Sequence, residues 1–397
     1  MTDRRMKMDF FPAVRHVMLW TMLWGLSAAL HAFERSDSLT LLFVGDLMQH
    51  KAQLDAARTP EGKYDYSECF PYVEEEIRKA DIAVGNLEVP LGGSPYTGYP
   101  AFSAPDEWLQ ALCKAGFDVF LTANNHCLDR GGKGLVRTLE QLQKAGVKAV
   151  GTYADSLDFK SRHPLLVEQK GFRIVFLNYT YGTNGIPVPR ANIVNGIDKN
   201  RMRRDIQQAR SMKPDAIIAC LHWGIEYRRL PEKPERELAE WLLEMGVDHV
   251  IGGHPHVVQP IEVRPSAYKP DRSVVAYSLG NFISNMSQKH TDGGLMLKLV
   301  LKKRLGRTRL DRCAYSLVWT SRPPLSGKKR FTLYPASMDE NGMTAAERLR
   351  MGDFLKQTRA LFQERNIGIK EEFLKKKALN NLQNKNKVVT LHSLLKG

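Results

Sequence analysis

Short apolar runs alternate with amphipathic stretches along this chain from residue 39 onward, and this alternation strongly restricts its fold. The β-rich runs predict strands at residues 39–45, 81–87, 118–124, 173–181, 215–223, 248–253, 273–282 and 294–303. Apolar residues at helical spacing predict helices at residues 106–115, 133–145, 200–212 and 234–245. Together these elements predict an α/β layered domain, in which functional residues lie at the carboxyl ends of strands.

Polar side chains stand at the ends of five of these predicted strands. Taken singly, a Gly-Asp pair is usually a turn, and a lone histidine is usually a hydrogen-bonded structural residue. Here the polar residues occur together at one expected edge of the sheet: Asp46, Glu88, Asn125 with His126, His222, and His254 with His256. This combination predicts a metal site.

Carboxylate, amide and neutral imidazole groups together suit two neighbouring divalent metals such as Mn²⁺, Zn²⁺ or Fe. Such metals activate water, so the chemistry needs no serine or cysteine nucleophile. The chain contains no GxSxG motif and no P-loop motif GxxxxGK[ST]. The missing P-loop argues that this chain alone is not an ATP-driven ligase.

Six motifs carry a resemblance to a known family: GDLM (45–48), GNLE (85–88), ANNHCLDRG (123–131), LHWGIEY (221–227), GGHPHVVQP (252–260) and SLGNF (278–282). Over about residues 39–285 the chain resembles the CapA-type poly-γ-glutamate capsule synthesis family, a branch of the calcineurin-like metallophosphoesterase superfamily. The resemblance implies a four-layer αββα sandwich of the metallophosphoesterase type, with two divalent metal ions at the strand ends.

The resemblance also implies a role for each metal ligand. Asp46 would bind the first metal, and Glu88 would bridge the two metals. Asn125 and His222 would serve the second metal. His254 and His256 would complete one metal each.

Two further residues would act on the substrate. The resemblance implies that His126 lies near the substrate as a proton donor or charge stabiliser. Asp129 would orient the His126 ring, as carboxylates often do beside metal sites. Asn281 would be a pocket residue at most.

The chain departs from the wider superfamily at Met48, where the usual first motif, Asp-x-His, has histidine. The first metal thereby loses a nitrogen ligand, which agrees with the CapA branch and argues against strong phosphodiesterase activity. His50, four residues after Asp46, is either a substitute ligand or a surface histidine.

Residues 1–32 have the pattern of an export segment. Arg4, Arg5, Lys7 and Arg15 precede an apolar run at residues 17–30. This run is short for a bilayer-spanning helix and predicts a signal peptide or an N-terminal anchor. A buried hydrophobic helix is the remaining alternative. Both export interpretations place the rest of the chain in the periplasm or at the extracytoplasmic face of the membrane.

The formal net charge of +15 is concentrated at one end of the chain. Residues 301–397 hold 22 lysines and arginines against 8 aspartates and glutamates, a net charge of +14. We therefore expect a CapA-like metallophosphatase domain at residues 33–303 and a basic, partly helical C-terminal extension at residues 304–397. The extension is either a solvated face or a contact for anionic polymer or lipid headgroups.

Two functions from different classes follow. The first is an exported metal-dependent hydrolase of capsule or poly-γ-glutamate biosynthesis, acting on a phosphoester or on the anionic polymer. The alternative is a non-catalytic metal-binding component of a membrane polymer-synthesis or export complex. Nucleic acid is not expected as a partner, because the export segment separates the chain from it and the basic region has few interleaved aromatic residues.

Overall fold

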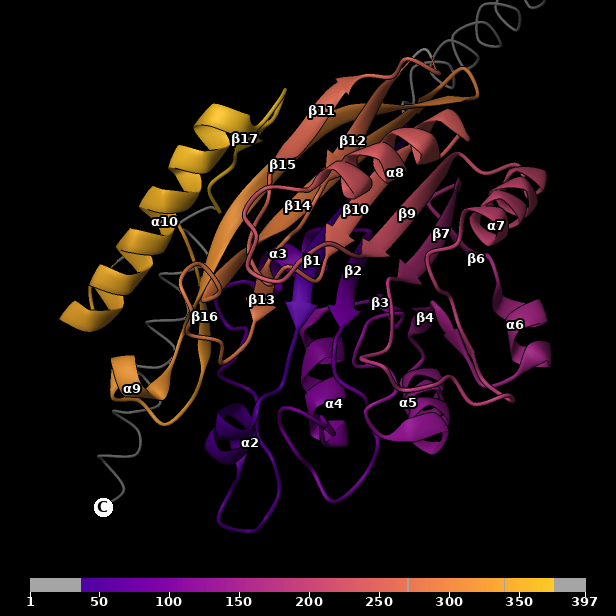
Figure 1. Cartoon of the computed structure of the whole chain (residues 1–397). Helices are drawn as coiled ribbons and strands as arrows, with labels where there is room; N and C mark the ends of the chain where they lie inside the picture. The colour runs from indigo at the N-terminus through magenta and orange to yellow at the C-terminus, as the bar shows by residue number, and fades with distance from the viewer. Residues whose placement is uncertain (1–36, 270, 339, 375–397) are drawn as a thin grey trace, which may run out of the picture.

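The structure is a computed structural model that describes residues 37–374, apart from residues 270 and 339 (Figure 1). The predicted signal peptide or anchor at residues 1–32 lies outside the described residues, as do residues 375–397. None of the helices described is both long enough and apolar enough to cross a membrane.

The first sheet contains nine strands among the described residues, and its long axis follows the order β16-β15-β14-β1-β2-β3-β4. Strands β1 to β4 run parallel, while β14, β15 and β16 are antiparallel neighbours. In that order the strands span Thr332–Pro335, Arg307–Ser321, Gly293–Arg304, Asp37–Leu47, Ile82–Leu87, Val119–Leu121 and Lys148–Val150. Short strands β13 (Asn281–Ile283) and β17 (Lys370–Glu371) pair with β1 and β15.

The second sheet has the order β11-β12-β10-β9-β7-β6. Its central strands β7, β9, β10 and β12 are parallel, and β11 and β6 close the two edges as antiparallel strands. In sheet order the strands span Ile261–Pro265, Arg272–Ala276, His249–Gly253, Ala216–His222, Phe172–Thr180 and Leu165–Gln169. A separate small ribbon pairs β5 (Thr152–Tyr153) with β8 (Ile193–Val194).

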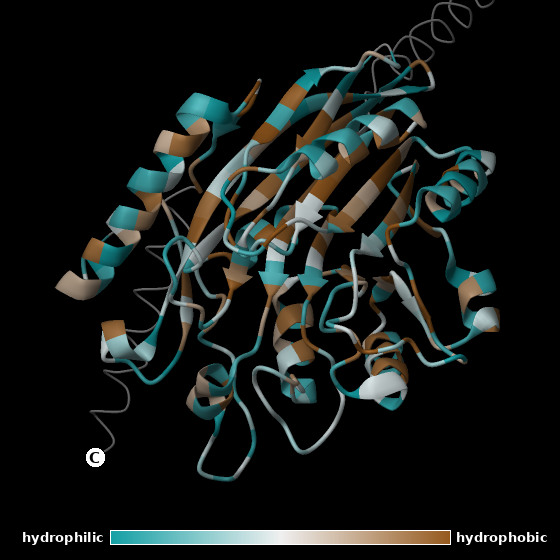
Figure 2. Ribbon diagram, in the orientation of Figure 1, coloured by the Kyte–Doolittle hydropathy of each residue, from teal (hydrophilic) through white to brown (hydrophobic). Residues whose placement is uncertain are grey.

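Strand β1 shows why the sheets stack between helices. Side chains alternate across a strand, so Leu41 and Phe43 join the apolar cluster between the two sheets. Leu42 and Val44 join a second cluster that packs the other face of the same sheet against helices. Because both faces of the strand are covered by protein, it is almost continuously apolar, and Figure 2 shows hydrophobic colour concentrated along the strands.

Helices cover both outer faces. Residues of α3 (Glu74–Lys79), α4 (Asp106–Ala115) and α5 (Gly131–Lys144) pack on the first sheet. Residues of α7 (Lys199–Ser211) and α8 (Lys233–Glu244) pack on the second sheet in a third apolar cluster. The layers therefore run helix, sheet, sheet, helix, which confirms the predicted four-layer αββα sandwich. The remaining helices are α2 (Lys51–Ala57), α6 (Ser156–Arg162), α9 (Pro323–Ser326) and α10 (Ala345–Arg365).

The boundary expected after residue 303 differs from the structure. Strand β14 turns directly into β15, and the two pair from Gly293 with Trp319 to Arg304 with Arg307. Leu310, Leu317 and Trp319 of β15 are buried between the sheets. Residues 307–335 therefore belong to the main sheet. The basic, interrupted sequence concealed these strands because their charged residues lie on the exposed half of β15.

Helix α10 is the helical part of the expected C-terminal extension, and it lies along one side of the sandwich (Figure 1). Its first turn is capped by Thr344, whose side chain accepts a hydrogen bond from the Glu347 amide. Met351, Phe354 and Phe362 belong to the cluster between the sheets. This part of the basic extension is thus integral to the core.

The segment after α10 links the two sheets, and we call residues 366–372 the clasp. Ile367 forms two backbone hydrogen bonds with β11. Its amide donates to the Ile261 carbonyl at 2.9 Å, and its carbonyl accepts from the Val263 amide at 2.7 Å. A few residues later, Lys370 pairs with Ala314 of β15 in the first sheet. The clasp therefore holds the edge of one sheet against a strand of the other.

Candidate metal centre

The candidate metal site lies where the carboxyl ends of parallel strands from both sheets meet. Asp46 lies near the end of β1, and Glu88 directly follows β2. From the second sheet, His222 ends β9, and the loop after β10 carries His254 and His256. All five side chains are at most 3% exposed.

Close backbone packing brings the ends of these strands together. The amide of Asp46 donates a hydrogen bond of 3.0 Å to the carbonyl of Gly280. A Cβ on Gly45 would lie 1.8 Å from that carbonyl oxygen, so only glycine fits beside Asp46. The glycine of the GDLM motif is therefore needed to position the aspartate.

The GGHPH loop holds its two histidines in an unusual backbone conformation. The φ angles of His254 and His256 are +97° and +59°. Such angles are rare for residues other than glycine and cost of the order of 1–3 kcal/mol each. Strain of this kind persists where surrounding structure enforces it, and here it turns both imidazoles toward the carboxylates.

Potential ligand atoms form three overlapping sets, each with all its atoms within 4.8 Å of one another. Glu88 belongs to two sets, which matches the bridging position that the family resemblance implies. The sets are Glu88 with His222 and His254, Asp46 with Glu88 and His256, and Glu226 with His254 and His256.

Two buried atoms indicate that the site suits a cation. Glu88 Oε1 and His254 Nδ1 have no hydrogen-bond partner among the described residues. Glu88 Oε1 lies 3.5 Å from His222 Nε2 and 3.7 Å from His256 Nε2, too far for good hydrogen bonds. An unpaired buried carboxylate oxygen is costly unless something else compensates its charge. The residues present therefore fit a divalent metal.

Charges at the site lead to the same conclusion. Burial and the charge of Asp46 raise the pKa of Glu88 well above its usual value. Burial and the neighbouring imidazoles hold the pKa of His222 well below 6.5, and burial followed by the charge of His256 lowers the pKa of His254 to about 3. When a site that suits a cation is considered without that cation, burial is expected to raise the pKa of its carboxyl groups and to lower the pKa of its imidazoles. Glu88, His222 and His254 show these shifts.

Asn86 contacts three of the expected ligands, and sequence reasoning missed it. Its Nδ2 lies 2.8 Å from Asp46 Oδ1, 3.3 Å from Glu88 Oε2 and 3.3 Å from His222 Nδ1. Asn124 holds Asn86 in turn, by donating to its Oδ1 at 3.2 Å. The available signal was the GNLE motif, in which Asn86 precedes the expected bridging Glu88 by two residues and so shares its side of the strand.

Asn125 and His222 come together as the family resemblance implies. Asn125 Oδ1 lies 2.9 Å from His222 Nε2. The Asn125 amide also donates to Asn184 Oδ1 at 3.2 Å. Two expected donors to the second metal therefore point at one position.

His126 and Asp129 form a pair beside these groups. His126 Nδ1 lies 2.8 Å from Asp129 Oδ2, which also accepts a 2.9 Å hydrogen bond from the Phe102 amide. Phe102 packs edge-on against the His126 ring, with ring centroids 4.8 Å apart. Asp129 and Phe102 thus fix the ring and leave Nε2 as the nitrogen available to a substrate.

Asn281 contacts a ligand, which is more than the pocket role expected for it. His256 Nδ1 lies 3.1 Å from both Asp46 Oδ2 and Asn281 Oδ1. Asn281 donates its Nδ2 to the Thr291 carbonyl at 2.8 Å, so its Oδ1 faces the imidazole. In neutral His256 the proton therefore sits on Nδ1, and Nε2 offers its lone pair toward Glu88.

Met48 and His50, the two residues after Asp46 that the sequence analysis considered as ligand positions, lie outside the candidate ligand sets. Met48 is buried in the apolar cluster between the first sheet and its helices. His50 precedes α2, lies 3.2 Å from Gln53 Oε1 through Nδ1, and belongs to none of the candidate ligand sets found in the described residues. The structure thus places neither residue 48 nor residue 50 among the ligands.

Partly exposed groups surround the buried ligands. Tyr181 packs on His254 with ring centroids 4.5 Å apart, and Tyr227 lies 6.4 Å from His256. Tyr99 lies 6.5 Å from His126. Glu226, an exposed carboxylate of the LHWGIEY motif, completes one ligand set and was also missed from the sequence. These residues form an aromatic and acidic rim at the entrance.

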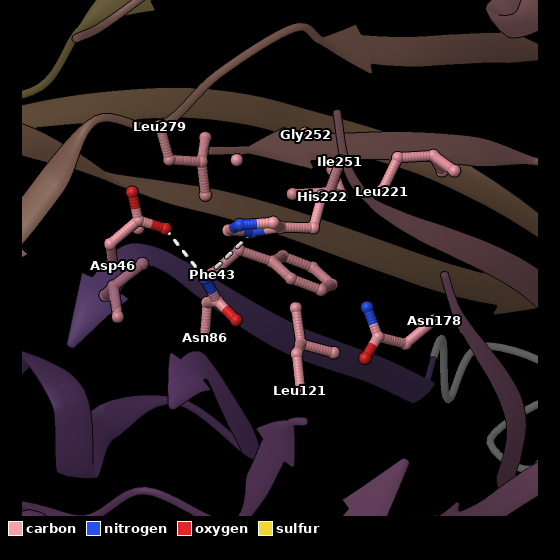
Figure 3. A pocket seen from close by; sticks show the side chains of 13 residues that line it. Phe43, Asp46, Asn86, Leu121, Asn178, Leu221, His222, Ile251, Gly252 and Leu279 are labelled. Carbon is pink, nitrogen blue, oxygen red and sulfur yellow. Dashed lines mark hydrogen bonds between the residues drawn. The ribbon is translucent and has the colours of Figure 1, made fainter. Parts of the chain in front are cut away.

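Beneath the ligands lies a small cavity between the sheets. Figure 3 shows Asp46, Asn86 and His222 joined by hydrogen bonds at one side of this pocket, with Phe43, Leu121 and Leu279 among its apolar lining. The ligands therefore stand on an apolar floor, which strengthens electrostatic interactions above it.

A family model described as bacterial capsule synthesis protein PGA_cap matches residues 40–286. The chain belongs to this family. Residues 40–286 include every candidate ligand described above, so the capsule synthesis family shares the region that builds the site.

Curated relatives in the family come from two Bacillus species. The chain is 27% identical over 280 residues to the capsule biosynthesis protein CapA of Bacillus anthracis, covering 67% of this chain and 65% of that protein. It is 28% identical over 303 residues to the PGA biosynthesis protein CapA of Bacillus subtilis, covering 72% of this chain and 74% of that protein. The chain thus spans just under two thirds of the Bacillus anthracis relative.

Solved structures with a similar arrangement include phosphoesterases. The calcineurin-like phosphoesterase YfkN from Bacillus subtilis aligns with a TM-score of 0.42 and 13% identity, covering 83% of this chain and 99% of that one. The NAD nucleotidase of Haemophilus influenzae aligns with a TM-score of 0.46 and 12% identity, covering 89% and 68%.

Proposed function

We propose that this member of the capsule synthesis family is an exported, metal-dependent hydrolase of capsule or poly-γ-glutamate biosynthesis. Its substrate would be a phosphoester or the anionic polymer itself, and it would work in the periplasm or at the extracytoplasmic face of the membrane. Family membership supports the process, and the signal peptide or anchor predicted at residues 1–32 supports the location.

The observation that carries the hydrolase proposal is the position of Glu88. Its unpaired Oε1 lies between His222 Nε2 and His256 Nε2 at 3.5 and 3.7 Å. Asp46 and His256 would hold one metal and His222, His254 and Asn125 the other, with Glu88 shared. Two divalent ions at such a site supply Lewis acidity and an activated water for attack at phosphorus or a carbonyl.

The chain's own residues would complete the reaction. His126, held through Nδ1 by Asp129, would present Nε2 to the leaving group and give it a proton. The apolar floor and the tyrosine rim would limit bulk water at the reacting atoms. Tyr181 and Tyr227 would contact the substrate at the entrance, since both are partly exposed.

The proposal is tested by the double variant His254→Ala/His256→Ala. We expect elemental analysis of the purified protein to show loss of bound metal, and hydrolysis of an aryl phosphodiester or of poly-γ-glutamate with added Mn²⁺ to vanish. His290→Ala is the matched control, because His290 belongs to none of the ligand sets found in the described residues. Unchanged metal content in the folded double variant would overturn the site assignment.

Met48 favours the alternative, a non-catalytic metal-binding component of a membrane polymer-synthesis or export complex. Methionine has no side-chain nitrogen, and Met48 is buried in the core, so position 48 supplies no donor to the first metal. A fully metal-loaded protein that turns over neither substrate, yet co-purifies with the polymer-synthesis machinery, would favour this role over the hydrolase.

A further inference from the structure

The turn between β14 and β15 lies at the opposite end of the domain from the metal site. Asp37 at the start of β1 pairs with Lys303 near the end of β14, whereas Val44 pairs with Met296. Strand β1 then runs from Asp37 to Asp46, about 30 Å at about 3.3 Å per residue. In Figure 1 the arrows of β1 and β2 point away from the end where β14 meets β15.

This turn carries three arginines without partners. The side chains of Arg304, Arg307 and Arg309 form no ion pair or hydrogen bond with any described residue, and all three residues are exposed. Nearby carboxylates have other partners: Lys303 binds Asp215, Lys302 binds Asp311, Lys269 binds Asp248, and Asp271 accepts a 3.0 Å hydrogen bond from the Leu310 amide. The turn therefore presents three arginines that form an ion pair with no carboxylate of the described residues.

A leucine stands at the tip of the turn. Arg304 pairs with Arg307, so Leu305 and Gly306 form a two-residue loop, and their φ angles are +54° and +70°. Both angles are those of a type I′ turn, for which Asn-Gly is the favoured sequence. Leu305 is 67% exposed and occupies a backbone conformation that costs leucine of the order of 1 kcal/mol. Neither packing nor turn geometry explains a leucine here.

An aromatic residue lies at the same end. The turn between β11 and β12 carries Tyr268, which is 47% exposed. Arg272, at the start of β12, donates hydrogen bonds of 2.8 Å to the carbonyls of Leu310 and Asp311, and so ties this turn to β15. We call Tyr268, Arg304, Leu305, Arg307 and Arg309 the basic end.

The apolar run of residues 17–30 joins the domain at the basic end. Only residues 31–36 separate this run from Asp37. At no more than about 3.6 Å per residue, the link spans less than about 25 Å. A basic, aromatic and leucine-tipped surface from which the chain leads, within this reach, to an apolar run of sequence matches the chemistry of a bilayer interface with anionic headgroups.

We propose that the basic end docks on an anionic lipid surface. Arg304, Arg307 and Arg309 bind the headgroups, and Leu305 enters the layer at headgroup depth. In this orientation the metal site faces the aqueous compartment. It lies about 30 Å from the lipid, because β1 extends about 30 Å from the basic end to Asp46. An anionic polymer would also attract the arginines, but it offers nothing to an exposed leucine.

The test uses the full chain in vesicles that contain spin-labelled lipid as a fluorescence quencher. A fluorophore is attached to the cysteine of Leu305→Cys. The control carries the fluorophore at Ile225→Cys, at the opposite end of the domain. Ile225 follows β9, and its side chain is 52% exposed. The unmodified chain is treated in parallel to measure labelling of Cys113 and Cys313, the two native cysteines that are not fully buried.

We expect quenching at position 305 but not at position 225 in vesicles containing phosphatidylglycerol, and little quenching at either position in pure phosphatidylcholine. Changing Arg304, Arg307 and Arg309 to glutamine should reduce partitioning of the turn roughly a hundredfold, at about 1 kcal/mol for each arginine. High salt should have the same effect by screening.

A second variant separates docking from folding. Leu305→Asn places the preferred residue in the type I′ turn, so the hairpin should be at least as stable while vesicle binding weakens. Three results would overturn the proposal: equal quenching at positions 305 and 225, equal quenching in neutral and anionic vesicles, or a fluorescence change at position 305 on adding poly-γ-glutamate without vesicles. The last result would identify the polymer as the ligand.

Discussion

Asn86 donates a 2.8 Å hydrogen bond from Nδ2 to Oδ1 of Asp46 beneath the candidate ligands. The same nitrogen lies within 3.3 Å of Glu88 and His222, so one amide orients groups from both sheets. Because its partners come from β1, β2 and β9, this amide couples the geometry of the ligands to the stacking of the sheets.

Replacing Asn86 should therefore weaken metal binding without removing a ligand. For Asn86→Ala we expect metal affinity to fall by about 10–100-fold, the usual cost of losing a group that orients ligands. Calorimetric titration with Mn²⁺ measures the change. Gln143→Ala, on the exposed side of α5, is the control and should bind metal like the parent. Unaltered affinity in Asn86→Ala would show that this amide is dispensable.

Metal affinity should rise with pH. Burial and Asp46 raise the pKa of Glu88, and although burial opposes it, the hydrogen bond and charge of Asp46 raise the pKa of His256 above 6.5. Both groups must lose protons to bind metal, so protons compete until the pH exceeds these raised values. His222 and His254 add little to this proton competition, because burial lowers the pKa of each below 6.5. Competition with a metal-indicator dye between pH 5 and 8 would reveal the slope, and a flat profile would contradict it.

The clasp gives a stability prediction with a matched control. Gly368 and Gly327 both have φ of +66°, but a Cβ on Gly368 would lie 2.1 Å from the Val263 carbonyl oxygen, whereas one on Gly327 would meet nothing within 4 Å. Gly327→Ala should cost about 1–2 kcal/mol for the backbone conformation alone. Gly368→Ala should cost about 1–3 kcal/mol more, from the clash. Urea denaturation measures both, and equal losses would show that the clasp is loose.

His126 should matter most for poor leaving groups. If the imidazole supplies a proton, His126→Gln lowers kcat by about 10²–10⁴-fold on substrates with basic leaving groups and less on activated aryl esters. Asp129→Asn should show the same trend more weakly, because the ring loses its partner at Nδ1. Metal content should stay unchanged in both variants. A uniform loss across leaving groups would indicate that His126 only stabilises charge.

Truncation separates the two parts of the basic extension. Removing residues 344–397 would delete Met351, Phe354 and Phe362 from the cluster between the sheets, at about 1.5–3 kcal/mol for each buried side chain. We expect no folded protein from that deletion. Removing only residues 375–397, which carry six lysines and no acidic residue, tests charge alone. Thermal melting should be unchanged, and a lowered melting temperature would contradict this division.

The sequence predicted the elements that have a strong periodic pattern. The helix expected at residues 106–115 occurs with those bounds. The predicted strands that correspond to β1, β2, β3, β7, β9 and β10 each begin within two residues of the predicted start. The positions of Asp46, Glu88 and His254 at strand ends followed from topology, because parallel strands place their carboxyl ends at one edge.

Other features depended on contacts that no local pattern records. β15 mixes an exposed basic half with a buried half, so its charged residues concealed a strand that pairs with both β14 and β16 in the first sheet. Asn86 became visible only when β9 brought His222 beside it from the other sheet. The exposed Glu226 joins the ligand sets only through the bent backbone at His254 and His256.

The pairing of Asp37 with Lys303 has a consequence for how the chain acquires its fold. Strand β1 is central to its sheet, yet its neighbour β14 is separated from it by most of the sequence. Contacts of such high sequence separation form slowly, because a long loop must close first. The clasp adds further late contacts at residues 366–372. A chain of this topology completes its core only after its C-terminal third is available, so its N-terminal strands wait for partners that are synthesised last.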